Sequence, residues 1–140
     1  MLFVCDAPGG TTWFEIETEM EAARESQLMN HAVEKYFLRA RESAVATYTP
    51  TSRAFIEQDI GLASHIKASM PTFATLRDAE GNGLATAMLP PKASKERTFT
   101  SVVVGPSNAD PYPQHAEAIG FLAAYFGVSL DRDRCYPYRR

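Results

Sequence analysis

Short stretches rich in β-branched and aromatic residues flank two runs of turn-forming residues. The stretches are Leu2–Cys5 with Thr11–Glu17, and Thr72–Arg77 with Leu84–Leu89. The first pair encloses a Pro-Gly-Gly turn and the second an Asn-Gly turn, so each predicts an antiparallel β-hairpin. A fifth strand is predicted from Thr98 to Val104, whose apolar end indicates a central position buried on both faces of a sheet.

Three other stretches show the helical period of apolar residues. A capping box at Thr18 predicts the start of a long helix from Glu19 to Glu42. A second helix is expected from about Arg53 to Ser69, with an apolar stripe along one side. A third is expected from Gln114 to Phe126, where Gly127 is a typical C-terminal stop.

The resulting order of elements is β-β-α-α-β-β-β-α. This order predicts the α+β class, with a mostly antiparallel sheet of about five strands and three helices on one of its faces. The length of 140 residues fits a single domain. We expect that domain to cover residues 1–130 and to be followed by an extended C-terminal tail at 131–140.

Composition and charge exclude several classes of protein. The hydrophobic share of 45% and charged share of 22% are those of a soluble globular chain. The net charge of −3 argues against nucleic-acid binding. The longest apolar run, residues 118–128, is too short for a membrane span. Without a recognisable export signal, we expect a cytoplasmic protein with free thiols at Cys5 and Cys135.

Metal and cofactor motifs are absent from the sequence. No two histidines or cysteines stand at the spacing of metal ligands. The Gly-rich run at residues 81–83 lies between two predicted strands and precedes no helix, so it is a turn rather than a nucleotide loop. We therefore expect no metal site and no cofactor.

The segment Gly105–His115 is the strongest candidate for a binding site. It joins the end of a predicted strand to the start of a helix, where free backbone amides can hold an anion. Its candidate ligand-binding residues are Ser107, Asn108 and Tyr112, and its candidate catalytic residues are Asp110 and His115.

His115 and a third catalytic candidate, Asp59, each allow a structural explanation as well. The helical period places His115 in line with Ile119 and Leu122, so we expect an inward-facing, neutral imidazole. It could act as a base toward a ligand. Alternatively, it could be a hydrogen-bonded core residue in a helix whose N-cap is Asp110. Asp59 lies within the apolar stripe of the second helix, where a carboxylate is either buried and functional or the N-cap of a helix beginning at residue 60.

Two functions remain open. The third helix is apolar on nearly all sides, and Leu28 and Leu38 fall outside the main stripe of the first helix. These features favour a small, soluble, non-enzymatic interaction module that forms homo-oligomers, most simply a two-fold dimer. The alternative is a protein that binds a small molecule or anion, or an enzyme, with its site at Gly105–His115. We see no catalytic constellation, which favours a non-enzymatic role.

Overall fold

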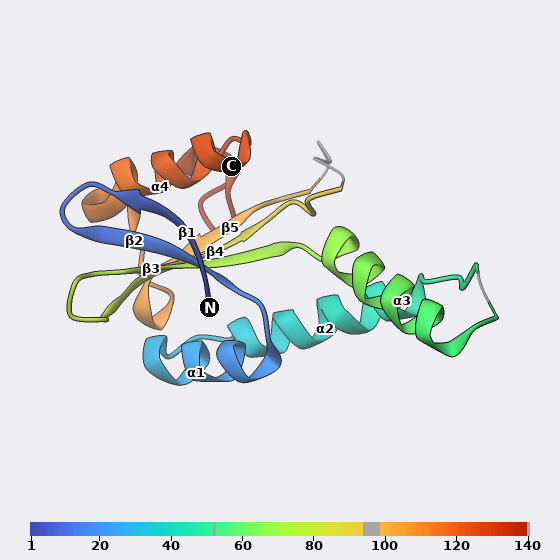
Figure 1. The fold of residues 1–140 in the computed structure, drawn as a ribbon. Coiled ribbons are helices and arrows are strands. Elements are labelled where there is room, and N and C mark those ends of the chain that lie inside the picture. Colours follow the sequence, from blue (N-terminus) through green and yellow to red (C-terminus); the bar gives the residue numbers. More distant parts are fainter. Residues whose placement is uncertain (52, 94–98, 140) are drawn as a thin grey trace.

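Five antiparallel strands form one sheet that carries helices on both faces (Figure 1). The structure, a computed structural model, describes residues 1–51, 53–93 and 99–139. The strands are β1 (Leu2–Ala7), β2 (Thr11–Ile16), β3 (Thr72–Arg77), β4 (Gly83–Leu89) and β5 (Val102–Val104). The helices are α1 (Glu19–Met29), α2 (Val33–Ala46), α3 (Phe55–Ser69) and α4 (Tyr112–Phe126), with short 3-10 helices η1 (Pro106–Asn108) and η2 (Arg132–Arg134). The predicted α+β class and five-stranded antiparallel sheet are confirmed.

Both predicted hairpins are present, because their turns supply the backbone geometry that tight reversals need. The β1–β2 turn contains Gly9 and Gly10 at φ values of 76° and 71°, a region that glycine enters without steric cost. In the β3–β4 turn, the Asp78 carboxylate accepts hydrogen bonds from the backbone N–H groups of Glu80 and Asn82, at 3.0 and 2.9 Å. The residues within each turn therefore determine both chain reversals, through glycine in the first and the Asp78 side chain in the second.

The predicted long helix is two helices, so the structure has four helices rather than three. The capping box is present: the Thr18 hydroxyl accepts from the Glu21 N–H, and the Glu21 carboxylate accepts from the Thr18 N–H. The helix then ends at Asn30, which adopts a left-handed conformation with a φ of 51°. Asparagine tolerates this conformation better than most residues and is a recurrent helix terminator. The chain turns there and restarts as α2.

The expectation that all helices share one face of the sheet is wrong. Helices α1 and α2 cover one face and α4 covers the other (Figure 1). Successive residues of β2 are therefore buried on opposite sides. Trp13 is fully buried and its indole N–H donates to the Ala118 carbonyl of α4 at 2.8 Å, while Ile16 packs in the same cluster as Phe37 of α2.

Strand β5 lies at the edge of the sheet and not at its centre. The predicted strand began at Thr98, which lies outside the described residues, and the observed strand is limited to Val102–Val104. The chain after α4 covers this edge: the Tyr136 backbone N–H donates to the Ser101 carbonyl at 2.9 Å. Because both faces of this sheet are covered, even an edge strand is apolar, which explains why its composition resembled that of a central one.

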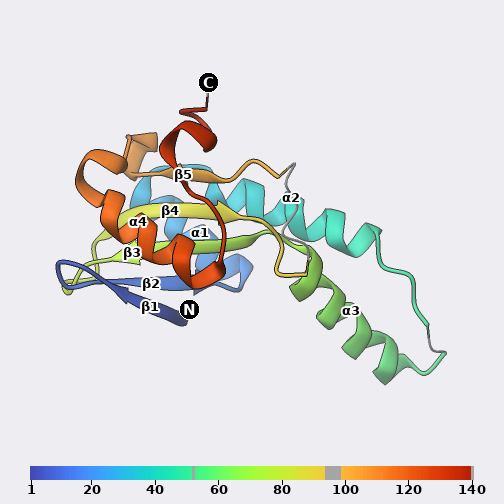
Figure 2. The same ribbon diagram turned by 90° about the horizontal axis from the view of Figure 1, so that it is seen from above.

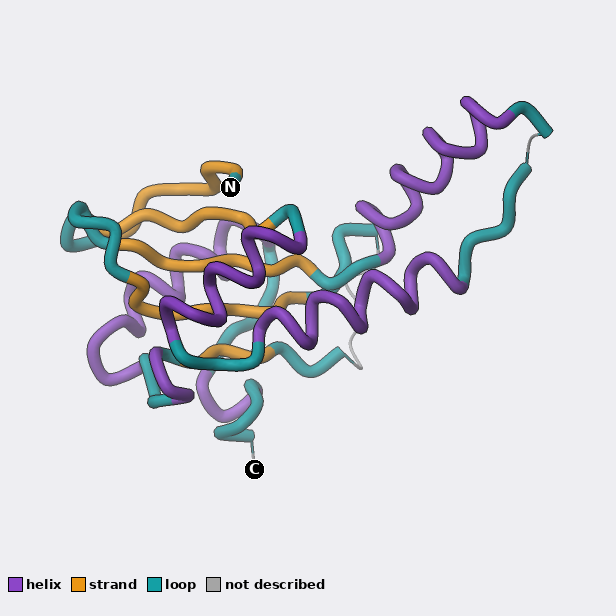
Figure 3. The backbone as a smooth tube through the Cα atoms, turned by 90° about the horizontal axis from the view of Figure 1, so that it is seen from below, coloured by secondary structure: helices purple, strands orange, loops and turns teal. Residues whose placement is uncertain are grey.

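Helix α3 projects beyond the end of the sheet, as Figures 2 and 3 show from opposite sides. Its predicted position in the sequence is confirmed, but of its apolar stripe only Ile66, near the C-terminal end, packs against the core. None of its residues is buried, and Phe55, Ile56 and Ile60 are 84%, 75% and 63% exposed. In the described part of the chain, no helix combines the length and the apolar character that crossing a bilayer requires.

Helix α4 buries one side and exposes the other. Ala118, Ile119 and Leu122 pack into the core, whereas Phe121 and Tyr125 remain about half exposed. The predicted stop is confirmed, since Gly127 takes a left-handed φ of 66° at the C-cap. The expected burial of this helix on several sides is not observed within the single chain.

Candidate functional site

A cavity of about 440 Å³ lies between the first turn of α2 and the β4–β5 side of the sheet. Its walls come from the α1–α2 break, α2, the strands, η1 and the C-terminal segment around Tyr136. Its volume falls within the range of roughly 300–1,000 Å³ that is typical of small-molecule sites. Among the described residues that line it, none is aspartate, glutamate, lysine or arginine. The cavity is thus an uncharged and largely apolar space.

Three non-glycine residues in or next to the cavity wall adopt the left-handed conformation. They are Asn30 in the helix break and Ser107 and Asn108 in η1, at φ values of 51°, 56° and 60°. The Asn30 side-chain amide donates to the Ser107 hydroxyl at 3.0 Å, which ties the break to η1. Non-glycine residues in this region of φ are uncommon and tend to cluster at binding sites.

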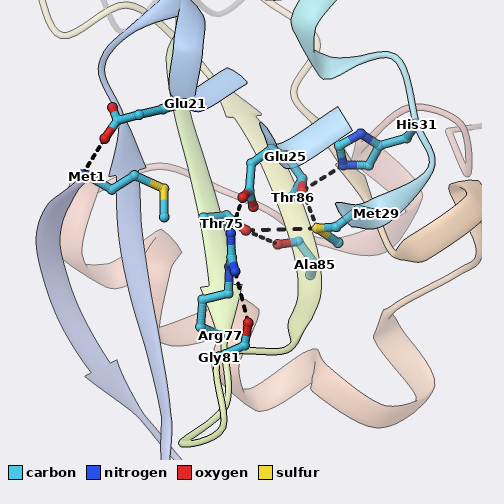
Figure 4. A network of polar contacts seen from close by, with 10 residues as sticks. All are labelled: Met1, Glu21, Glu25, Met29, His31, Thr75, Arg77, Gly81, Ala85 and Thr86. Carbon is cyan, nitrogen blue, oxygen red and sulfur yellow. Dashed lines mark hydrogen bonds and ion pairs between the residues drawn. The ribbon is translucent and has the colours of Figure 1, made fainter. Parts of the chain in front are cut away.

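His31 follows directly after the break and lines the cavity. Figure 4 shows its ring next to Thr86 of β4, whose hydroxyl oxygen lies 2.8 Å from His31 Nε2 and 3.1 Å from the Met29 sulfur. The Val33 backbone N–H is directed at Nδ1, which leaves the ring proton on Nε2, so His31 Nε2–H donates to the hydroxyl oxygen. The other ring nitrogen, Nδ1, accepts from the Val33 backbone N–H at 3.5 Å.

These contacts favour a neutral imidazole. Burial lowers the pKa of His31, and the nearby Glu25 carboxylate opposes this only in part. A proton on Nδ1 would also face the Val33 N–H, a second donor. A neutral His31 with both ring nitrogens engaged holds the wall of the cavity in place and is poorly suited to take up a proton from a ligand.

The stability of the protein should therefore depend on the charge state of His31. The unfolded chain takes up a proton at this residue near the ordinary pKa of about 6.5, before the folded chain does. The free energy of unfolding should thus fall as the pH decreases from about 6.5 toward the lower folded pKa. Urea unfolding of the wild type and of His31→Gln between about pH 7.5 and 5 measures this effect. The wild type should lose more stability than the variant, and parallel pH profiles would contradict the assignment.

Three other residues that line the cavity carry uncharged polar groups: an amide on Asn108 and hydroxyls on Tyr36 and Tyr136. Within the described ranges, no hydrogen bond to another residue occupies any of them. The cavity therefore offers donors and acceptors without charge, set among apolar side chains.

The predicted segment Gly105–His115 is divided between two places. Its first part borders the cavity: Asn108 lines the wall, and Ser107 next to it accepts a hydrogen bond from Asn30. Asp110 lies apart: its carboxylate accepts from the Tyr112 N–H at 3.0 Å and pairs with Arg132 at 2.7 Å. The Arg132 guanidinium lowers the pKa of this carboxyl. The chain's own carboxylate thus occupies the helix start at which an anion was expected.

Tyr112 and His115 lie on α4, on the face of the sheet opposite α2 (Figure 1). The Tyr112 hydroxyl donates to the Leu130 carbonyl at 2.6 Å, and burial raises its pKa strongly, so its contacts are structural. His115 is half-buried, at a backbone irregularity with a φ of −127° inside the first turns of α4. The structure does not bring either residue to the cavity.

Asp59 lies on the exposed side of α3. The helix begins at Phe55 and runs without interruption past residue 59. The residue is therefore neither a buried functional carboxylate nor an N-cap. Neither Asp59 nor His115 is among the residues that line the cavity.

The residues that sequence reasoning missed are His31, Tyr36 and Tyr136. One continuous helix over 19–42 would have placed His31 on a solvated face, and only the Asn30 terminator pointed to a break. No local signal brings Tyr136 to the cavity, since it arrives through a backbone pairing with β5.

Metal and thiol chemistry find little support among the described residues. Residues 1–51, 53–93 and 99–139 contain no group of three histidine, cysteine, aspartate or glutamate side chains placed to hold a metal ion. Cys5 and Cys135 are free thiols, as expected, and burial raises the pKa of both. Comparisons with models of protein families, with curated proteins and with solved structures found no match to this chain.

Proposed function

We propose that this protein binds a compact, uncharged and largely apolar small molecule in the cavity beside His31. The observation that carries the proposal is a cavity of about 440 Å³ whose described lining residues include no charged side chain. A charged ligand would lose its hydration there without gaining a partner of opposite charge. The proposal keeps the small-molecule alternative drawn from the sequence but moves the site from Asp110 and His115 to His31 and Asn108.

The lining also favours a ligand with a flat ring. Tyr36, Phe73 and Tyr136 contribute aromatic side chains, and Met88 adds a flexible thioether that adapts to the shape of a ligand. The Asn108 amide can donate to a carbonyl or accept from a hydroxyl group. Binding rather than catalysis is the proposed activity, because the two nitrogens of His31 are already hydrogen-bonded.

A thermal-shift screen tests this function. The panel should contain neutral aromatic and alicyclic compounds, each paired with a carboxylated or phosphorylated analogue. A neutral ligand at about 100 times its dissociation constant adds about 2.7 kcal/mol to the folded state. For a chain of this length, that gain corresponds to a rise in Tm of roughly 8–11 °C. The charged analogues should give little or no shift.

Two substitutions in the cavity and one control outside it test whether any such shift arises from the cavity. Val104→Trp adds an indole to a half-buried lining position of β5 and should abolish the shift. Phe14→Trp, at a half-buried position of β2 outside the lining, is the matched control and should leave it unchanged. Asn108→Gly keeps the left-handed backbone while removing the amide from the cavity wall, so it should weaken the shift. Ligand binding that persists in Val104→Trp, or a panel in which only charged compounds bind, would overturn the proposal.

A further inference from the structure

Along its N-terminal and middle turns, the two sides of α3 are inverted relative to an ordinary surface helix. The side that faces the end of α2 carries small and polar groups there: Gly61 lies against the Tyr48 hydroxyl, and His65 Nε2 lies 2.9 Å from the Thr47 hydroxyl. Ile66, nearer the C-terminal end, is partly buried against the core. The outward side carries Phe55, Ile56 and Ile60, which are among the most exposed large apolar side chains of the described chain. A surface helix normally turns its apolar side toward the core. This reversal indicates that the outward side is covered by another molecule.

We propose that the outward side of α3 pairs with the same side of α3 in a second copy of this chain, in an antiparallel, two-fold arrangement. Its middle is suited to close approach, because the small and exposed Ala63 lies near the centre of the outward side. A two-fold axis at Ala63 places each residue level with the residue the same number of positions beyond the centre on the partner helix. Ala63 then meets its own counterpart on the partner helix.

The charges on this side fit such a pair. Asp59 lies four residues before Ala63 and Lys67 four residues after it, and both are exposed. The two-fold axis therefore brings Asp59 of each copy level with Lys67 of the other, which gives two ion pairs at the edges of an apolar contact. This self-complementarity favours a second copy over an unrelated partner. It also explains an acidic residue within an apolar stripe, which neither capping nor burial explains.

Charge reversal provides the first test, with molecular mass measured by light scattering after size exclusion. We expect the wild type to elute with the mass of two chains. Asp59→Lys creates two repulsive lysine pairs and should shift the protein to a single-chain mass. The double variant Asp59→Lys/Lys67→Asp restores opposite charges and should restore the dimer. Recovery in the double variant is specific to a helix that faces its own copy.

Apolar substitution and cross-linking test the same surface independently. Ile60→Glu should give a monomer, whereas Phe121→Glu on the half-exposed side of α4 should remain a dimer. Ala63→Cys should form an intermolecular disulfide under mild oxidation, while Ser64→Cys, one residue away and also exposed, should not. Circular dichroism confirms that each variant is folded.

Three results would overturn the proposal. They are a wild type of single-chain mass at about 100 µM, a dimer that tolerates both Asp59→Lys and Ile60→Glu, or a double variant that stays monomeric. None of these outcomes depends on ligand binding, since α3 contributes no residue to the cavity.

Discussion

Replacing Arg77 with methionine should lower the free energy of unfolding by about 3–5 kcal/mol, because it leaves a buried carboxylate without a counter-charge. Glu25 of α1 is 1% exposed and forms an ion pair with Arg77 of β3 (Figure 4). Arg77 also donates to the Gly81 carbonyl at 2.9 Å, so the variant loses a contact within the β3–β4 turn as well. Urea unfolding monitored by circular dichroism measures the change.

Replacing Glu25 instead of Arg77 should lower the free energy of unfolding by a smaller amount. In Glu25→Met the remaining charge belongs to Arg77, whose side chain is 15% exposed and long enough to reach solvent. The double variant Glu25→Met/Arg77→Met should be close to the wild type, since Glu25 Oε1 and Arg77 Nε are buried without a hydrogen-bond partner in the described chain. The control is Arg41→Met in the exposed pair with Glu19, where we expect a loss of about 0–1 kcal/mol. Equal losses in the two Met variants of the buried pair would contradict this account.

Replacing Trp13 with alanine should cost about 3–5 kcal/mol. The indole is fully buried between β2 and α4, and its N–H donates to the Ala118 carbonyl. Removing it opens a cavity in the core cluster that attaches α4 to the sheet. Thermal and urea unfolding should both show the loss.

Two further substitutions separate the indole's volume from its hydrogen bond. Trp13→Phe keeps most of the apolar volume and should cost about 1–3 kcal/mol, chiefly through the lost donor. Phe3→Ala removes an aromatic ring that is 56% exposed on the neighbouring strand, and its cost should stay below about 1 kcal/mol. A Trp13→Ala variant as stable as Phe3→Ala would show that α4 is held by other contacts.

The parts of the fold that the sequence predicted are those determined by neighbouring residues. The turns at Gly9 and at Asn82, the capping box at Thr18 and the stop at Gly127 all act over a few residues, and all are present. The break at Asn30 was missed because it spans only three residues and the apolar stripe continues in phase beyond it. The coverage of both sheet faces was not predicted, because the alternation at Phe14 and Ile16 was interpreted as one buried face opposite a solvent-exposed face. Trp13 points to that other face and is buried there in a second core cluster.

The candidate site was predicted only in part for a similar reason. Ser107 and Asn108 lie in a loop whose composition marks it as irregular. Asn108 lines the cavity, and Ser107 next to it accepts a hydrogen bond from Asn30. The other walls come from segments around residues 31–36, 86–88 and 136–137, which only tertiary packing brings together. A pattern of apolar positions reports which residues are buried but not which of them face one another.

The order of strands along the sheet has a consequence for how the chain reaches this structure. Every strand pairs with its neighbours in sequence, and the β1–β2 and β3–β4 hairpins each close over a few residues. Such local contacts form early and at small entropic cost. The β2–β3 pairing alone must span residues 17–71, with three helices inserted between the two strands. Joining two preformed hairpins across this insertion is therefore the step at which we expect folding to be slowest, since loop closure must precede the contacts that stabilise it.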